Sequence, residues 1–122
     1  MKREIEAFLK LKELAEKMND EIACIVVEGK EDRKALQKIG YKGKILYFNS
    51  LRKVKNLGRK IVILSDFDEE GEEIAKIALK ELGERNVEMY FRSEFKKILK
   101  SIGRNNIQSI INLCKKYERM YQ

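Results

Sequence analysis

Short apolar runs alternate with helix-like segments along this sequence, and this alternation predicts an α/β fold. Residues 22–27 (IACIVV), 44–48 (KILYF) and 60–65 (KIVILS) are rich in apolar and β-branched side chains, which is typical of strands buried inside a sheet. Residues 86–91 (NVEMYF) alternate enough to predict a fourth strand at a sheet edge. Because helix-like segments separate these runs, we expect parallel strands joined by right-handed crossovers.

Apolar residues at helical spacing fill the segments around the strands. The N-terminal segment has one apolar and one charged face, and the glycines after two later segments are expected to end helices. The predicted helices cover residues 2–18, a segment ending at Gly40, a short basic segment from Asn49 or Ser50 to Leu57, residues 70–82, and two C-terminal segments at 94–102 and 106–121.

We expect a single domain over residues 1–122, with its core at about 22–91. A chain of 122 residues with 43% hydrophobic residues has enough apolar surface for one core. A strand order of 2-1-3-4 would place the carboxyl ends of the first and third strands side by side, at the point where open α/β sheets bind ligands. The expected architecture is a compact Rossmann-like fold with a four-stranded, mainly parallel sheet, flanking helices, an N-terminal helix and two C-terminal helices.

The composition argues against several classes of function. The sequence has no histidine, and its two cysteines, Cys24 and Cys114, are isolated, so zinc binding and histidine catalysis are disfavoured. No apolar run approaches the roughly 20 residues of a membrane span, and residues 1–17 lack the apolar centre of a signal peptide. We therefore expect a cytoplasmic protein without membrane contact.

The net charge of +7 is unevenly distributed. Residues 41–60 carry seven basic and no acidic side chains, residues 61–91 carry nine acidic against three basic ones, and residues 92–122 carry eight basic against two acidic ones. An acidic segment between basic flanks suits a metal-dependent protein acting on a polyanion. A Lys/Glu-rich composition selected for heat stability, with solvated charges, is an equal alternative.

Three carboxylates follow the ends of the first and third predicted strands. Glu28 comes after the first strand, and Asp66 and Asp68 come after the third. Each acid alone could be a turn former or a helix N-cap. If the two strand ends are neighbours, however, the acids would repel one another unless a cation enters, and oxygen ligands favour Mg²⁺ or Mn²⁺. We therefore predict a metal site, with Glu28 also able to reach a bound water or a leaving oxygen.

Basic residues near these strand ends are candidate phosphate contacts. Seven cations without one acid between residues 41 and 60 favour contact with nucleic acid, although a solvated face is the alternative. The predicted phosphate-binding residues are Lys30, Lys42, Lys44, Arg52, Lys53, Lys55 and Arg59. A second set, in which phosphate contact and solvation are equally favoured, comprises Arg92, Lys96, Lys97, Lys100 and Arg104.

The pair of motifs VVEGKED (26–32) and LSDFDEEGEEI (64–74) resembles the Toprim domain of topoisomerases, bacterial-type primases and several nucleases. The resemblance is greatest to the small ribonuclease that matures 5S ribosomal RNA. It implies that Glu28 is the acid/base residue and that Asp66 and Asp68 bind metal.

The same resemblance assigns further residues. Gly29 and Gly71 match the close-packing glycines of the family, while Lys30, Asp32 and Glu72 match the ribonuclease-like branch, which adds Glu72 to the metal set. Phe67 departs from the proline that many relatives have between the two aspartates.

These observations predict a Mg²⁺-dependent nuclease, acting on structured RNA or on DNA. The alternative is a non-catalytic nucleic-acid-binding Toprim module that works within a larger complex, with a protein partner supplying specificity. A third reading, a flavodoxin-like phosphate-relay domain, fits Glu28-Gly29-Lys30 poorly because it expects a pair of acids after the first strand.

Overall fold

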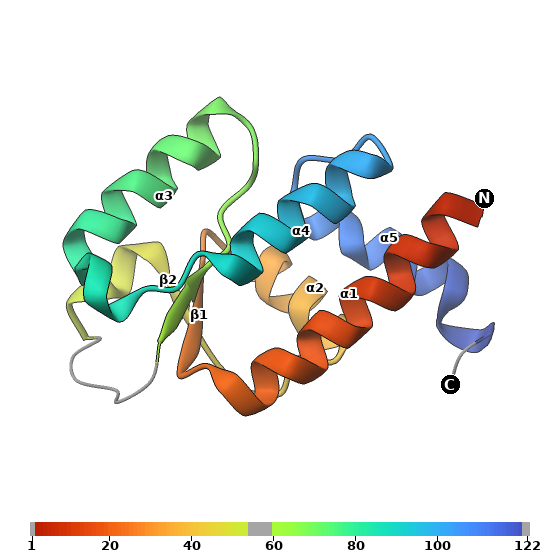
Figure 1. Ribbon diagram of the computed structural model, residues 1–122, viewed down its shortest axis with the longest axis horizontal. Helices are drawn as coiled ribbons and strands as arrows, with labels where there is room; N and C mark the ends of the chain where they lie inside the picture. Colours follow the sequence, from red (N-terminus) through yellow and green to blue (C-terminus); the bar gives the residue numbers. More distant parts are fainter. Residues whose placement is uncertain (1, 54–59, 121–122) are drawn as a thin grey trace.

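A computed structural model describes residues 2–53 and 60–120, apart from the side chains of residues 2, 52 and 53. Within these residues a parallel sheet contains β1 (Cys24–Val27), β2 (Lys44–Tyr47) and β3 (Ile61–Ile63) in the order β2-β1-β3. Figure 1 shows the short strands at the centre with helices around them. The predicted α/β class and the 2-1-3 part of the strand order are therefore confirmed.

The fourth strand predicted at residues 86–91 is wrong. Only Val87 reaches the sheet, through a single parallel bridge to Ile61, and the Glu88 N–H donates to the Ile61 carbonyl at 3.0 Å. The Glu88 carboxylate then accepts the Phe91 N–H at 3.1 Å, and a helix begins at Tyr90. The segment therefore passes the edge of β3 and turns into a helix before a strand can form.

Five α-helices are present in the described part of the chain, some with limits other than those predicted. They are α1 (Lys2–Glu21), α2 (Lys30–Ile39), α3 (Glu69–Leu82), α4 (Tyr90–Ser101) and α5 (Ile110–Tyr117). Short 3-10 segments are η1 (Phe48–Lys53), η2 (Glu84–Asn86), η3 (Ile107–Ser109) and η4 (Glu118–Met120). The helix predicted over 106–121 is thus divided, because the Asn106 side chain accepts the Ser109 N–H at 2.9 Å and caps η3.

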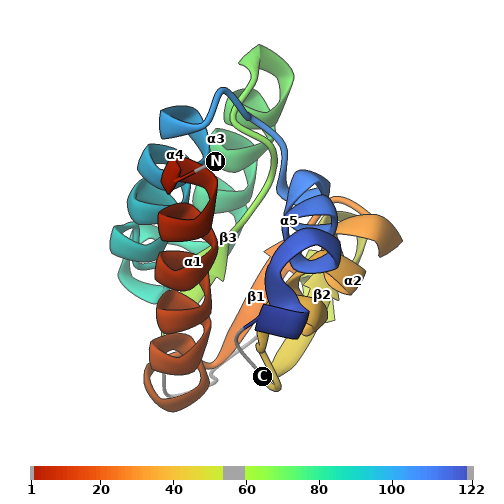
Figure 2. The same cartoon turned by 90° about the vertical axis from the view of Figure 1, so that its right-hand side faces the viewer.

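The two faces of the sheet pack against different helices. Ile25 and Val27 of β1 belong to a large core with α1, α2, α4 and α5, whereas Cys24 and Val26 belong to a smaller core with α3 and η1. This division follows from the two-residue period of a strand. Figure 2 shows α1 and α4 side by side, with α2 and α5 forming a second pair.

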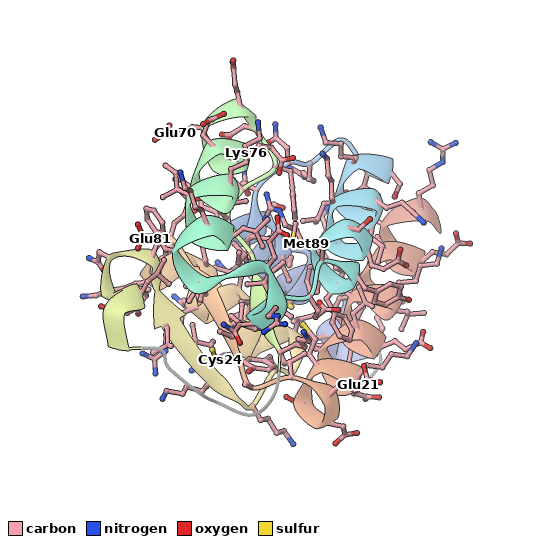
Figure 3. The ribbon with its side chains drawn as sticks, turned by 60° about the vertical axis from the view of Figure 1, so that its left-hand side comes forward. Glu21, Cys24, Glu70, Lys76, Glu81 and Met89 are labelled. Carbon is pink, nitrogen blue, oxygen red and sulfur yellow. The ribbon has the colours of Figure 1, made fainter. Side chains whose placement is uncertain are left out.

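The outer face of α3 lies away from the cores and is mostly polar, with Ile77 exposed on it. Glu70, Lys76 and Glu81 are exposed along it (Figure 3), and Ala75, Ala78 and Leu82 face the smaller core. None of the helices in the described residues is long and apolar enough to cross a membrane.

Candidate functional site

The carboxyl ends of β1 and β3 lie side by side. Val26 pairs with Ile63, and the Leu64 N–H donates to the Val26 carbonyl at 2.8 Å. Immediately beyond, the Asp66 N–H donates to Glu28 Oε2 at 2.8 Å. The first and second acidic motifs therefore meet at one edge of the sheet.

Asp66 is held from a third direction by the C-terminal part of the chain. Its Oδ1 accepts the backbone N–H of Ile107, the first residue of η3, at 3.0 Å. Partial burial raises the pKa of Asp66, the Ile107 N–H opposes this rise, and the negative charges of Glu28 and Asp68 add to it. Asp66 is therefore a half-buried acid in a negatively charged site.

Asp68 lies two residues further on and caps α3. Its Oδ1 accepts the Gly71 N–H at 2.7 Å, which is the usual N-cap arrangement. Between the two aspartates, Phe67 is only 3% exposed and its N–H donates to the Asn105 carbonyl at 2.7 Å. Asp68 is exposed and Asp66 is partly exposed, while Phe67 is directed into the core.

Asp32, which the resemblance singled out without giving it a metal-binding or catalytic role, is a fourth acid of this site. It is 8% exposed, and its Oδ2 accepts the Gly29 N–H at 3.2 Å, which fixes the start of α2. Burial, reinforced by the charges of Asp66 and Glu28, raises the pKa of Asp32 to about 6. Its position three residues after Gly29, as in a capping box, is the sequence signal for its contact with the Gly29 N–H.

The three predicted acids have the oxygen chemistry that Mg²⁺ or Mn²⁺ requires. Each of Glu28, Asp66 and Asp68 uses one carboxylate oxygen to accept a backbone N–H, and the other oxygen makes no hydrogen bond within residues 2–53 and 60–120. However, no three acidic or cysteine side chains in those residues are grouped closely enough to hold an ion on their own. The residues fit an ion that keeps several water ligands, as Mg²⁺ usually does.

Glu72, predicted as a further metal ligand, is paired with two cations. One of its oxygens binds the Arg92 guanidinium, and the other accepts from Lys96 Nζ at 3.1 Å. Burial alone would raise the pKa of Glu72, but the hydrogen bonds from Arg92 and Lys96 outweigh it and hold the pKa below its usual value. Glu72 thus differs from the other three predicted ligands, because both of its oxygens pair with cationic side chains.

The two glycines of the motifs have different environments. A Cβ on Gly71 would overlap the backbone carbonyl of Asp66, so only glycine allows α3 to approach the loop this closely. A Cβ on Gly29 would meet nothing within 4 Å, and its φ of −159° is open to any residue. The prediction of close packing is therefore wrong for Gly29, whereas it agrees with the geometry at Gly71.

The predicted basic residues are spread over the sheet. Lys30 is exposed at the first position of α2, two residues after Glu28. Lys42 precedes β2 and Lys44 is its first residue. Lys44 pairs with Cys24 at the start of β1, so both lysines lie at the end of the strands opposite the acids. Lys55 and Arg59 lie outside the described residues, as do the side chains of Arg52 and Lys53.

Arg92, placed in the second basic set, is not a surface cation. It is 4% exposed and contacts backbone carbonyls at the end of β3 and in the loop that follows. Phosphate contact by its guanidinium is therefore ruled out in this fold.

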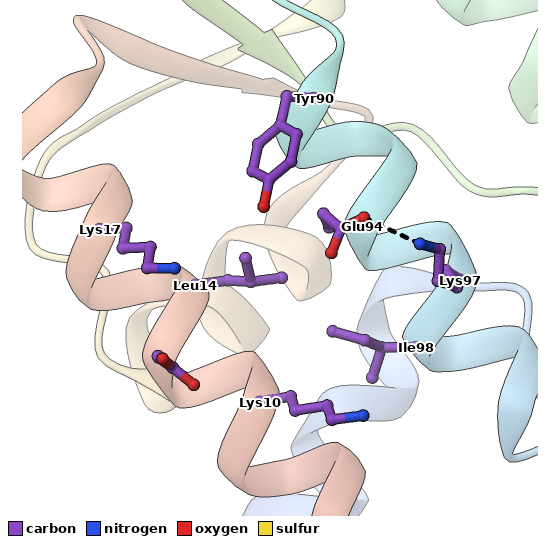
Figure 4. Close-up of a pocket in the computed structure, with 8 residues that line it drawn as sticks. Lys10, Leu14, Lys17, Tyr90, Glu94, Lys97 and Ile98 are labelled. Atoms are coloured by element: carbon purple, nitrogen blue, oxygen red, sulfur yellow. Dashed lines mark ion pairs between the residues drawn. The ribbon is translucent and has the colours of Figure 1, made fainter.

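A separate surface cavity of about 270 Å³ lies between α1 and α4. Figure 4 shows Lys17 of α1 across the cavity from Tyr90 of α4, and Lys10 across from Ile98. An ion pair of 3.3 Å joins Glu94 and Lys97. The cavity lining mixes both signs of charge over an apolar floor and includes none of the acids at the sheet edge. The cavity is therefore distinct from the acidic site.

The parallel sheet, with its acids at the meeting ends of β1 and β3, is the arrangement of a Toprim domain. Residues 23–98 match the family model described as Toprim domain. The chain belongs to the Toprim family, and this membership supports a nucleic-acid-related, metal-binding function.

Within that family, the chain is similar to archaeal proteins named UPF0292. It is 30% identical over 113 residues to the "UPF0292 protein" of Thermococcus onnurineus, covering 88% of this chain and 84% of that protein. It is 31% identical over 96 residues to a UPF0292 protein of Methanocaldococcus jannaschii, covering 71% and 75%.

A solved structure of a protein from Aquifex aeolicus has the same fold. It superposes with a TM-score of 0.60 at 25% identity, covering 85% of this chain and 94% of the other. The resemblance therefore extends beyond residues 23–98 to most of the chain.

Proposed function

We propose that this protein is a Mg²⁺- or Mn²⁺-dependent phosphodiesterase that cleaves nucleic acid. The observation that carries the proposal is the direct bond between the two motifs, from the Asp66 N–H to Glu28 Oε2. It brings a potential acid/base group and a metal-binding pair to one edge of the sheet, where α/β proteins bind their ligands.

Each acid has a role suited to its environment. Asp66 and Asp68 would bind the ion with the oxygens not used for backbone hydrogen bonds. A bound Mg²⁺ would supply charge neutralisation for a phosphodiester and a lowered pKa for its water ligand. Glu28 is exposed, so its outer oxygen can take a proton from water or give one to the leaving oxygen.

Substrate phosphates would be held by basic side chains. Lys30 is the described cation next to Glu28 in sequence, and it is exposed. Residues 52–59 carry Arg52, Lys53, Lys55 and Arg59 without an acid, and we assign them to the nucleic-acid backbone. Lys42 and Lys44 would contact only a substrate long enough to reach the opposite end of the strands.

Structured RNA is the proposed substrate class, and the cytoplasm the proposed location. The RNA assignment rests on the EGKED and DFDEEGEE motifs, which resemble those of the ribonuclease that matures 5S ribosomal RNA. DNA cleavage is the competing outcome of the experiment below.

One observation favours a second function. The absence of a ready-made three-ligand metal group in the described residues, together with the pairing of Glu72 to Arg92, suits a nucleic-acid-binding module that does not cleave. Such a module would act in a complex whose partner supplies specificity.

A cleavage assay separates the two functions. Purified protein is incubated with labelled structured RNA, duplex DNA and single-stranded DNA, each with Mg²⁺, Mn²⁺ or EDTA, alongside the Glu28→Gln variant. We expect wild type to cleave RNA only with a metal ion and the variant to bind without cleaving. Binding without cleavage by wild type in every condition would support the module and end the nuclease proposal.

A further inference from the structure

Arg92 is a buried cation whose contacts all point toward the acidic site. It lies in the first turn of α4 and is 4% exposed. A buried charge without partners would be strongly destabilising. Its partners therefore indicate what the side chain is retained for.

The guanidinium binds three backbone carbonyls, one at the end of β3 and two in the loop that follows it. One terminal nitrogen donates to the Ile63 carbonyl at 3.2 Å and to the Ser65 carbonyl at 2.8 Å, and the other donates to the Asp66 carbonyl at 3.2 Å. Backbone carbonyls here replace the carboxylate or phosphate that the arginine fork usually binds. The contacts fix the backbone on which Asp66 sits.

Two further contacts hold the guanidinium itself. Its centre lies 4.7 Å from the ring centroid of Phe67, in cation–π range. The Glu72 carboxylate from α3 binds the nitrogen that also contacts Asp66. Arg92 therefore joins α3, α4 and the loop after β3 at one point.

We propose that Arg92 is a positioning residue for the acidic site, and that Glu72 acts through Arg92 rather than as a metal ligand. Fixing the carbonyls of Ser65 and Asp66 sets the direction of the Asp66 N–H toward Glu28 and of its carboxylate toward Ile107. Glu72 in turn neutralises the arginine and holds the guanidinium nitrogen that donates to the Asp66 carbonyl. The inference concerns the site of the proposed function, but the arrangement it describes can be measured without metal or substrate.

Amide hydrogen exchange tests the arrangement directly. The Asp66 N–H reports on its bond to Glu28, and the Ile107 N–H reports on its bond to Asp66. In Arg92→Lys, which keeps the charge but loses the fork, we expect both amides to exchange about tenfold faster or more, while β1 amides change little. Arg85→Lys is the matched control, because exposed Arg85 lies beyond the far end of α3, and no change is expected.

Glu72→Gln is the second variant, and it covers the case in which Arg92→Lys does not fold. Glu72 is only partly buried, so this variant should fold, and the same two amides should exchange faster. Unchanged exchange at Asp66 and Ile107 in a folded Arg92→Lys, or in Glu72→Gln, would overturn the proposal.

Mn²⁺ binding, measured by electron paramagnetic resonance, tests the role of Glu72. The comparison uses Arg92→Lys, Glu72→Gln and the variant that carries both substitutions. If Glu72 acts through Arg92, the double variant should have an Mn²⁺ affinity no lower than that of the single variant with the lower affinity. If Glu72 is a ligand, the fold-losses of Mn²⁺ affinity in the two single variants should multiply in the double variant, which would contradict the inference. Wild type that binds no Mn²⁺ would instead contradict the proposed function, and the exchange data would still decide the role of Arg92.

Discussion

The backbone N–H of Asp66 and the carboxylate of Glu28, which are 38 residues apart in the chain, are joined by a hydrogen bond of 2.8 Å. The bond uses only Glu28 Oε2 and leaves the other oxygen for chemistry. A glutamine can accept the same N–H with its amide oxygen, which makes substitution at Glu28 a test of proton transfer that leaves the arrangement in place.

Glu28→Gln should lower the rate of cleavage by about 10²- to 10⁴-fold at saturating Mg²⁺, because an amide cannot exchange the proton. Asp66→Asn should raise the Mg²⁺ concentration needed for half-maximal rate, because it removes a charged ligand. Cleavage rates measured against Mg²⁺ concentration distinguish the two effects. Full activity of Glu28→Gln would remove Glu28 from the mechanism.

Gly71→Ala should destabilise the fold by about 1–3 kcal/mol, because the added Cβ would overlap the Asp66 carbonyl and the loop would have to move. Gly29→Ala is the matched control, since its Cβ meets nothing within 4 Å, and its stability should stay within about 1 kcal/mol of wild type. Urea unfolding of both variants provides the comparison. Equal stabilities would show that α3 does not depend on this close approach.

Without metal, the contribution of Asp32 to the free energy of unfolding should fall as the pH rises from about 4 to 6. The pKa of Asp32 is raised from 3.8 to about 6, so over this range the folded state holds more protons than the unfolded state. Stability then decreases with increasing pH, by about 3 kcal/mol at most for this group. The raised pKa of Asp66 acts in the same direction.

Asp32→Asn isolates this contribution, because the amide oxygen can still accept the Gly29 N–H. The variant should be more stable than wild type at pH 8 and lose that advantage near pH 4. Thermal melts in EDTA across this range provide the measurement. A parallel pH dependence in wild type and variant would show that Asp32 titrates normally.

Nucleic-acid affinity should fall steeply with salt, because each phosphate neutralised by a cation releases a counterion. Reversing Arg52, Lys53 and Lys55 to Glu should weaken binding to all sequences alike and reduce the slope of log K against log salt. Fluorescence anisotropy at several salt concentrations measures both. The matched triple reversal of Lys76, Lys80 and Arg85, exposed on or just beyond α3, should have a smaller effect.

The central part of the fold follows from local sequence patterns. Apolar runs mark β1 and β3, and a glycine marks the end of α2. The structure contains all three elements. The strand predicted at 86–91 is wrong because helical spacing continues into this segment. Phe91, Phe95, Ile98 and Leu99 are buried on one side of α4. The alternation of these six residues predicts a strand, but the last of them belong to this longer helical pattern.

The acids of the site were predictable, but the groups that orient them were not. Glu28, Asp66 and Asp68 are marked by their positions after apolar runs. The partners of Arg92 are carbonyls 26–29 residues earlier in the chain, and any residue can supply a carbonyl. The sequence therefore does not distinguish Arg92 from a surface cation.

The bond from the Ile107 N–H to Asp66 has a consequence for how the protein is made. Domains fold during synthesis as their residues leave the ribosome, and the Toprim match is complete by residue 98. Asp66 nevertheless obtains this partner only when residue 107 has emerged. Ile107 also belongs to the large core that packs on the sheet, so the acidic site and that core are both completed only at this late stage of synthesis.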